Sequence, residues 1–544
     1  MVHPNTIFDE AKGQTFREYI YPRLNYVFQY ENRLTLFREV HPEKLYDICV
    51  YGNHKEIIDF DAMSNVYHPN MVDSSFVHDG TGYCHGREIV DEEGKKHLNL
   101  SGYKDRIIRY DESLLHLIAK VFEGTDEWQS CKLVSIHSER GIEIVKKLAD
   151  FAHLAQVEPF ITVGFDATNS LKDNTVKKET KYPDYEKYEM MFNSTQIGIL
   201  SPFSKMPQAI CLKDSQYDLA DYTMLKVTDI IRTNYLPKTD IISFKSQIDQ
   251  EGRWFSNYKM AFKKMLDVTH ERTLKGAIIP PKSSHMNSLI SVSFNNNAEL
   301  IEFAGLSSSV LLDFFLKTVG CKNLTNSVLL GLPFGIDDKY RKALNIRVLR
   351  LNCVNNWYKD LWEDMFTEEY CAEEWSQNDS RLSRFDSLEK TFNENVALRS
   401  DFERRMALVE LDVIAAQALG FTLDDLIFIY VSTFNTTQKY DADTWFDQNG
   451  RIVFSVCSEY DLKLPRKGNV KKGVVGWEDI RGNQIDVNTY AGVSPTYTHV
   501  IDFSQSEVFR GVQDTFVAPY TRCDRIADYR RAWAHFEELF NKNN

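Results

Sequence analysis

The sequence predicts a multidomain protein of the mixed α/β and α+β class, and three observations lead to this prediction. The chain has 544 residues, which is more than a single hydrophobic core normally serves. Segments with apolar residues at helical spacing alternate with short apolar runs that are typical of strands. Hydrophobic residues make up 43% of the chain, with only 25 Gly and 15 Pro, so we expect most of it to be packed.

The first unit, expected at residues 1–52, has the pattern of the end of an α/β sheet. A short helix is predicted at residues 15–20, because Pro22 stops it. Apolar runs at residues 26–30 and 45–51 predict two strands. Two strands are too few to form a stable sheet, so we expect further strands upstream of this unit.

A mixed α+β region is expected at residues 53–345. Within it, a basic amphipathic helix is predicted at residues 256–268, where aromatic residues share one side and lysines lie nearby. A strand is predicted at residues 289–294. A single buried helix is predicted at residues 300–318, because apolar residues occupy several of its faces.

The third unit, at residues 346–440, is predicted to be helical. One long helix is expected over residues 387–418, because apolar residues recur three and four positions apart and Gly420 stands where a C-terminal cap belongs. A second helix is expected at residues 423–431.

The last unit, at residues 441–544, is predicted to be an α+β domain. Its composition shifts to Gly, Asn and strand-like runs, including residues 452–456 and 498–503. A final helix is predicted at residues 525–540.

The charge balance limits the classes of partner. The formal net charge is −14, with 64 basic and 78 acidic residues. This charge excludes a uniformly basic surface for nucleic acid, but it permits a local basic groove on an acidic body.

The cysteine usage and the hydropathy pattern both predict a cytoplasmic protein. The nine cysteines are scattered singly without a CxxC pair, which is typical of a reducing compartment. The N-terminus lacks the pattern of a signal peptide, and no window reaches the roughly 18 to 20 apolar residues that a membrane span requires. We therefore expect no membrane contact.

The motifs of a SAM-dependent amino methyltransferase are missing from the sequence. Such an enzyme needs a glycine-rich turn beside the cofactor and an acidic-or-Asn, Pro, Pro, aromatic tetrad that grips the amino group. The one Pro-Pro pair, Pro280 and Pro281, is preceded by Ile279 and followed by Lys282. Neither GxxxxGK[ST] nor GxGxxG occurs, so phosphate loops are missing too.

One polar segment permits two interpretations. Asp166, Glu179 and Lys181 have residue types that could hold a divalent metal and orient an attacking water, as in a nuclease. Lys177, Lys178 and Lys181 fit contacts with DNA phosphates at least as well. Both interpretations stay open at the level of sequence.

Several phrases of the sequence resemble a known family. Among them are YPRLNYVFQYENRLTLFREV, ERTLKGAIIPP, LRLNCVNNWYKDLW and APYTRCDRIADYRRAWAHF. They resemble the C-terminal halves of very large bacterial DNA N6-adenine methyltransferases, the single-chain enzymes of DISARM-like phage defence and of type IIG-like restriction-modification systems. The resemblance covers nearly the entire chain, in order.

The resemblance implies a division of labour. In that family the N-terminal half carries the SAM site and the catalytic tetrad, and the part after it recognises the target. Residues 1–52 would then be the end of a methyltransferase-like sheet, and residues 53–345 would be like a target-recognition domain. We therefore expect a DNA-binding specificity subunit of a split adenine methyltransferase, without its own cofactor, that works with a separate SAM-binding subunit on double-stranded DNA.

The resemblance and the residue types together give candidate DNA contacts. Lysines are expected to bind phosphates, and amides to read adenine edges. For Asn352, Asn355 and Asn356, a helix-cap or turn role is the alternative. The candidates are Lys177, Lys178, Lys181, Arg232, Thr233, Asn234, Tyr235, Lys259, Lys263, Asn352 and Asn355.

Two other functions remain as alternatives. The first is a metal-dependent nuclease component that uses Asp166, Glu179 and Lys181. The second is a scaffold of a defence complex that does not bind DNA, in which the helix expected at residues 387–418 would be a docking surface.

Overall fold

The computed structural model describes most of the chain. The described residues are 1–42, 44–82, 84, 86–90, 96–246, 253–267, 270–319, 322–457, 464–469, 476–478, 496–500 and 513–542. They form a mixed α/β arrangement of many helices and several small sheets, so the predicted fold class is confirmed. Among these residues no helix is both long and apolar enough to cross a membrane.

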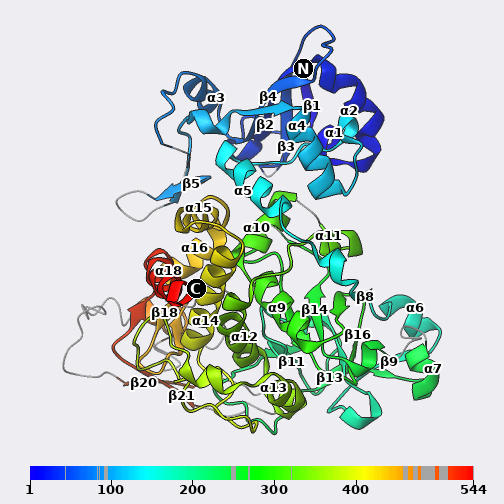
Figure 1. The fold of residues 1–544 in the computed structure, drawn as a ribbon, viewed down its shortest axis with the longest axis vertical. Helices are drawn as coiled ribbons and strands as arrows, with labels where there is room; N and C mark the ends of the chain where they lie inside the picture. Colours follow the sequence, from blue (N-terminus) through cyan, green and yellow to red (C-terminus); the bar gives the residue numbers. More distant parts are fainter. Residues whose placement is uncertain are drawn as a thin grey trace.

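A five-stranded sheet forms one end of the molecule's long axis (Figure 1). Its order is β1-β3-β2-β4-β7, and only the pair β2 and β4 is parallel. The strands are β1 (Val2–Pro4), β2 (Leu24–Glu31), β3 (Leu45–Tyr51), β4 (Asp59–Val66) and β7 (Ile108–Asp111). Strands β2 and β3 lie at the two predicted runs. The sheet continues through β4 and β7, so the expected boundary at residue 52 falls inside it.

We call the part of the molecule that lies beyond the five-stranded sheet in Figure 1 the larger body. A second sheet, which is four-stranded and antiparallel, lies in its core. Its order is β15-β14-β17-β8, with β8 at Phe160–Thr162, β14 at Lys259–Lys263, β15 at Gly276–Ile279 and β17 at Leu289–Ser293. Three helices follow in succession: α9 packs on β14 and β15, α12 on α9, and α14 on α12. Their bounds are Asn297–Ser307, Asp338–Asn352 and Asp401–Ala418.

The amphipathic helix predicted at residues 256–268 is wrong, because this segment contains strand β14. Every residue from Lys259 to Phe262 is buried, as expected for a central strand that is covered on both faces. Strand β14 pairs with β15 on one side and with β17 on the other. Tertiary pairing therefore overrides the helical spacing that the sequence also permits.

The helix predicted at residues 300–318 is two helices, α9 and α10 (Val310–Val319). The break lies at Ser308 and Ser309, whose hydroxyls donate back to the carbonyls of Gly305 at 2.8 Å and Leu306 at 2.7 Å. Serine side chains that bond to nearby backbone groups compete with the helix.

The long helix predicted at residues 387–418 begins only at Asp401. Ser400 and Glu403 form a reciprocal capping box that starts α14 there. Leu388 and Val396, which suggested a longer helix, are buried in turns that precede it. Their spacing reflects burial against the core rather than a helical face.

The chain returns to the helical core at its C-terminal end. The predicted helices are confirmed as α15 (Leu423–Thr433) and α18 (Arg525–Lys542). Helix α18 packs on α14, beside α16 (Asn435–Asp443) in Figure 1. A small sheet of order β19-β18-β22 lies next to them, at Ile452–Phe454, Trp445–Phe446 and Thr521–Arg522.

Candidate nucleic-acid interface

Two of the predicted DNA-binding segments are adjacent strands. Strand β9 (Val176–Lys181) pairs antiparallel with β13 (Thr233–Pro237), so that Lys181 lies opposite Thr233 and Lys178 opposite Tyr235. Figure 1 shows both strands at the edge of the larger body. We call these two strands, with the three lysines of β9, the basic ribbon.

The lysines of the basic ribbon lie at the surface and have weak partners. Lys177 forms an ion pair with Glu179 at 2.6 Å, and Lys181 with Glu189 at 2.7 Å; the lysine side chains are 44% and 39% exposed. Lys178 donates to the carbonyl of Leu212 at 2.8 Å. Ion pairs at such exposed positions are loosely held, so a phosphate can take the place of the carboxylate.

The segment from Arg232 to Tyr235 supports the ribbon more than it faces solvent. Arg232, Thr233 and Asn234 are at most 3% exposed. Thr233 donates its hydroxyl to the carbonyl of Met191 at 2.8 Å, and Asn234 accepts from the hydroxyl of Thr180 at 2.8 Å. These bonds hold β13 in place beside β9 and give this segment a structural role in the ribbon.

An exposed aromatic and an exposed aliphatic side chain lie beside the lysines, because Tyr182 directly follows β9 and the carbonyl of Leu212 accepts from Lys178. Tyr182 is 42% exposed and stacks under the guanidinium of Arg232, which lies 4.8 Å from the ring centroid. Ile210 and Leu212 are each 72% exposed. The sequence analysis missed Ile210 and Leu212, because a short apolar run predicts buried side chains. Only the folded structure shows that these two side chains are exposed.

The two candidate lysines of β14 lie elsewhere. Lys259 is fully buried; its ammonium donates to the carbonyl of Trp254 at 3.0 Å and lies 4.8 Å from that ring. Lys263, at the end of β14, lines a separate cavity. Neither residue joins the basic ribbon.

The candidate asparagines are engaged in backbone contacts. Asn352 is fully buried, accepts from the amide of Ile278 at 3.0 Å and donates to the carbonyl of Val348 at 2.9 Å. Asn355 accepts from the amide of Trp357 at 3.2 Å and is nearly buried. Of the three asparagines in this segment, only Asn356 has an exposed position.

The residues of the nuclease alternative have separate partners. Asp166 caps α6 (Ala167–Lys172) by accepting from the amide of Asn169 at 2.8 Å, and its other oxygen accepts from Asn287 at 2.6 Å. Glu179 pairs with Lys177, which holds the pKa of Glu179 below its usual value. Within the described ranges, no group of three His, Cys, Asp or Glu side chains could hold a metal ion.

A cavity of about 420 Å³ lies where α14, α16 and α18 meet the loops that lead into β11 (Lys205–Pro207) and β15. We call it the charged cavity. Lys205, Lys263, Arg272 and Lys275 line it from the sheet side. Arg404, Arg405 and Arg525 line it from the helices. The described carboxylates in its lining are Glu271, Asp401 and Asp441. The sequence analysis missed this site, because its residues are far apart in the chain.

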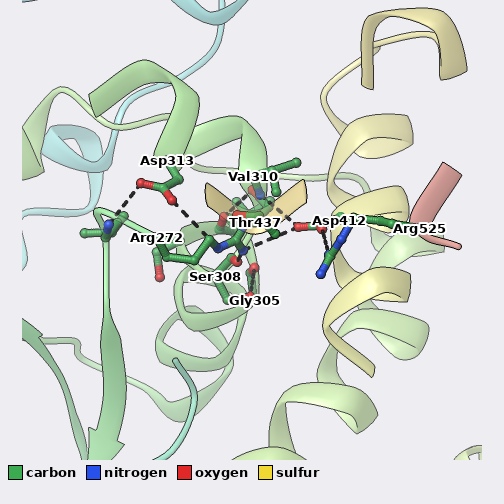
Figure 2. Close-up of polar contacts among 12 residues, drawn as sticks. Arg272, Gly305, Ser308, Val310, Asp313, Asp412, Thr437 and Arg525 are labelled. Atoms are coloured by element: carbon green, nitrogen blue, oxygen red, sulfur yellow. Dashed lines mark hydrogen bonds and ion pairs between the residues drawn. The ribbon is translucent and has the colours of Figure 1, made fainter. Parts of the chain in front are cut away.

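A buried network of charges fixes one wall of the charged cavity (Figure 2). Arg272 lies between Asp313 and Asp412, 3.7 and 3.6 Å from their carboxylates. Asp412 also accepts from the amide of Val310 at 2.8 Å, and Arg525 lies 3.6 Å from its other oxygen. This network therefore joins the loop that carries Arg272 to helices α10, α14 and α18.

Two carboxyls in the cavity have opposite pKa shifts. Burial alone would raise the pKa of Asp441, but Arg525, at 2.6 Å, and Arg405 hold it below its usual value. Burial raises the pKa of Asp401 to about 6, and the nearby carboxylate of Asp221 adds to the shift. Asp401 lines the cavity, and its Oδ2 accepts from the amide of Ile452 at 3.0 Å.

Comparison with known proteins identifies no family for this chain. No family model and no curated protein matches it. Among solved structures it is similar to the type IIG restriction endonuclease BpuSI, with 12% identity and a TM-score of 0.25 over 77% of this chain and 47% of that one. The chain thus spans about half the length of that protein. Folds this different carry no argument about activity.

Proposed function

We propose that this chain is the DNA-binding, target-recognition subunit of a split site-specific DNA adenine N6-methyltransferase in a restriction-modification or phage-defence system. A separate subunit binds SAM and transfers the methyl group. The observation that carries this proposal is the basic ribbon, in which two candidate segments far apart in sequence pair as adjacent strands and present three lysines at the surface.

The ribbon has the size and charge to contact duplex DNA. The major groove of B-DNA is about 12 Å wide and admits a two-stranded ribbon. Lys177, Lys178 and Lys181 would neutralise phosphates, which supplies affinity without sequence information. Tyr182 and Leu212, exposed beside them, would make apolar contacts with base edges.

A separate recognition body suits the chemistry of adenine methylation. The target base must leave the duplex before its amino group can react, at a cost of about a few kcal/mol. A subunit that holds the flanking duplex offsets this cost. The missing glycine turn and amine-gripping tetrad in this sequence support a transfer step carried out by a partner.

Duplex DNA binding by the purified chain tests the recognition role. We expect the triple variant K177Q/K178Q/K181Q to bind more weakly than wild type. The slope of log affinity against log salt concentration should decrease by about 2 to 3, because about 0.9 counterion is released per phosphate contact. Fluorescence anisotropy between low and moderate salt measures both quantities.

The matched control is K359Q/K390Q/K542Q, which removes three exposed lysines outside the ribbon. It changes the net charge equally and, like the ribbon variant, removes exposed ion pairs, here with Glu363 and Glu538. Equal binding by the two triple variants would reject the ribbon as the interface. Methylation of DNA by this chain alone would reject the division between two subunits.

A further inference from the structure

The charged cavity is a second place where the molecule gathers cations, and it is distinct from the basic ribbon. Its volume of about 420 Å³ lies within the range of small-molecule sites, roughly 300 to 1,000 Å³. Among the described lining residues, seven basic side chains face three carboxylates. This excess is opposite in sign to the net charge of the chain.

Arg404 contributes a positive charge that forms no ion pair with any residue the structure describes. Its guanidinium is nearly buried and donates to the carbonyls of Leu351, Leu398 and Leu200 at 3.0 to 3.1 Å and to the hydroxyl of Ser201 at 2.6 Å. All four acceptors are uncharged. They hold the guanidinium in place and leave its charge available to an anion in the cavity.

Two further cations have unused donors. The ammonium of Lys205, which lines the cavity, makes no hydrogen bond or ion pair with any described residue, while its backbone pairs with Leu219 of the neighbouring strand. Arg405 binds Asp528 at 2.7 Å through Nη1, while its Nη2 is buried and has no acceptor among the described residues. A buried guanidinium donor without a partner is costly, and an anionic ligand would satisfy it.

Flat side chains and hydroxyls complete the lining. Tyr222, Tyr440 and Phe446 border the cavity, and the guanidinium of Arg404 lies 4.2 Å from the ring of Tyr222. The hydroxyls of Ser204 and Thr437 lie in the same lining. Cations suit a phosphate, planar groups suit a base and hydroxyls suit a ribose, so the lining combines the contacts that a nucleotide needs.

We propose that the charged cavity binds one nucleotide unit, with its phosphate held by Lys205, Arg404 and Arg405. A free nucleotide and the 5′-terminal nucleotide of a strand share this chemistry. The rigid wall around Arg272 and Asp412 keeps the cavity open without a ligand. The site acts independently of the basic ribbon.

Isothermal titration of the full chain with dAMP tests the free nucleotide, and titration with a 5′-phosphorylated tetranucleotide tests the strand terminus. We expect at least one of them to bind, with competition by inorganic phosphate. Lys205→Gln should weaken this binding about tenfold, since it removes a charge-assisted contact with the phosphate. Lys263→Gln should weaken it less, since it removes only a positive charge from the lining. Lys390→Gln, outside the cavity, should bind as wild type does.

The ribbon variants separate this proposal from DNA recognition. K177Q/K178Q/K181Q should bind dAMP or the tetranucleotide as wild type does, even if its duplex affinity is lost. Thermal unfolding of each variant confirms that it is folded. If neither ligand binds, if Lys205→Gln binds with wild-type affinity, or if phosphate does not compete, the proposal is overturned.

Discussion

The basic ribbon and the charged cavity both gather positive side chains, but they hold them in opposite ways. In the ribbon, Lys177 and Lys181 are about two-fifths exposed and pair with glutamates nearby in sequence. In the cavity, the side chains of Arg272 and Arg525 are 6% and 10% exposed and pair with aspartates from other elements.

This difference follows from solvation. An exposed ion pair contributes about 0 to 1 kcal/mol, because water screens it and the side chains stay mobile. A buried charge has lost its hydration, and a fixed partner is needed to compensate for that loss in the folded protein. The ribbon is therefore suited to exchange partners with a polyanion, whereas the cavity is suited to hold one rigid shape.

The largest effect on stability is expected for a substitution in the wall of the charged cavity. Asp412→Ala should lower the free energy of unfolding by about 3 to 5 kcal/mol, because it leaves Arg272 and Arg525 buried without this carboxylate. Urea unfolding measures the loss. Asp386→Ala removes an exposed carboxylate paired with Arg384 and provides the matched control. A loss for Asp412→Ala no larger than for this control would contradict the structural role.

A smaller effect is expected at Asn352, which the sequence offered as a reader of bases. Asn352→Ala should lower the free energy of unfolding by about 1 to 3 kcal/mol, because the amide of Ile278 and the carbonyl of Val348 both lose a buried partner. Its affinity for duplex DNA should not change. Asn356→Ala, at an exposed position, is the control; weaker DNA binding by folded Asn352→Ala would restore the base-reading role.

The charge on Asp401 makes stability depend on pH. Burial and Asp221 raise the pKa of Asp401 from 3.8 to about 6, against the opposing effects of the Ile452 amide, Arg451 and Arg404. Between pH 3.8 and about pH 6, Asp401 is already ionised in the unfolded chain but still protonated in the folded protein. The free energy of unfolding therefore falls as pH rises through this range, and the loss is constant above about pH 6.

Asp401→Asn removes this penalty while its side-chain oxygen can still accept from the amide of Ile452, which now lies 3.0 Å from Asp401. The variant should gain stability over wild type at pH 7 by less than about 1 kcal/mol, because solvent in the cavity screens the charge. Thermal unfolding should show a smaller gain at pH 4.5. An equal gain at both values would contradict the raised pKa.

The smallest effect is expected on the ribbon. Glu179→Gln frees Lys177 and removes a negative charge beside the proposed phosphate path. We expect duplex affinity to rise less than tenfold and the unfolding midpoint to stay the same. Glu368→Gln, in a helical turn outside the ribbon, controls for net charge. A large loss of stability would show that this exposed pair holds the strand in place.

The sequence predicted elements best where local signals and tertiary environment agree. Helix α15 begins with Thr422 and Asp425 as a capping box, and its predicted start at residue 423 is confirmed. Strand β14 was missed, because lysines within an apolar run also fit a helical face. The burial of Lys259 in a strand that pairs on both sides could not be derived from the spacing of residues in the sequence.

The candidate site was predictable only in part, for a similar reason. Lys178 and Tyr235 were both candidates from sequence, but their pairing across two strands comes from the register of the folded chain. Lys205 and Arg525 gave no local signal at all. A cavity formed by side chains from many segments leaves no short motif, because each segment contributes one or two residues.

Sequence alone determined the mixed fold class, the acidic charge and the position of helix α15, because composition and caps act over a few neighbouring residues. Tertiary structure decided which cationic side chains stay hydrated and which are buried. That decision depends on packing between distant segments, and it separates a surface that can exchange ions from a cavity whose charges are fixed.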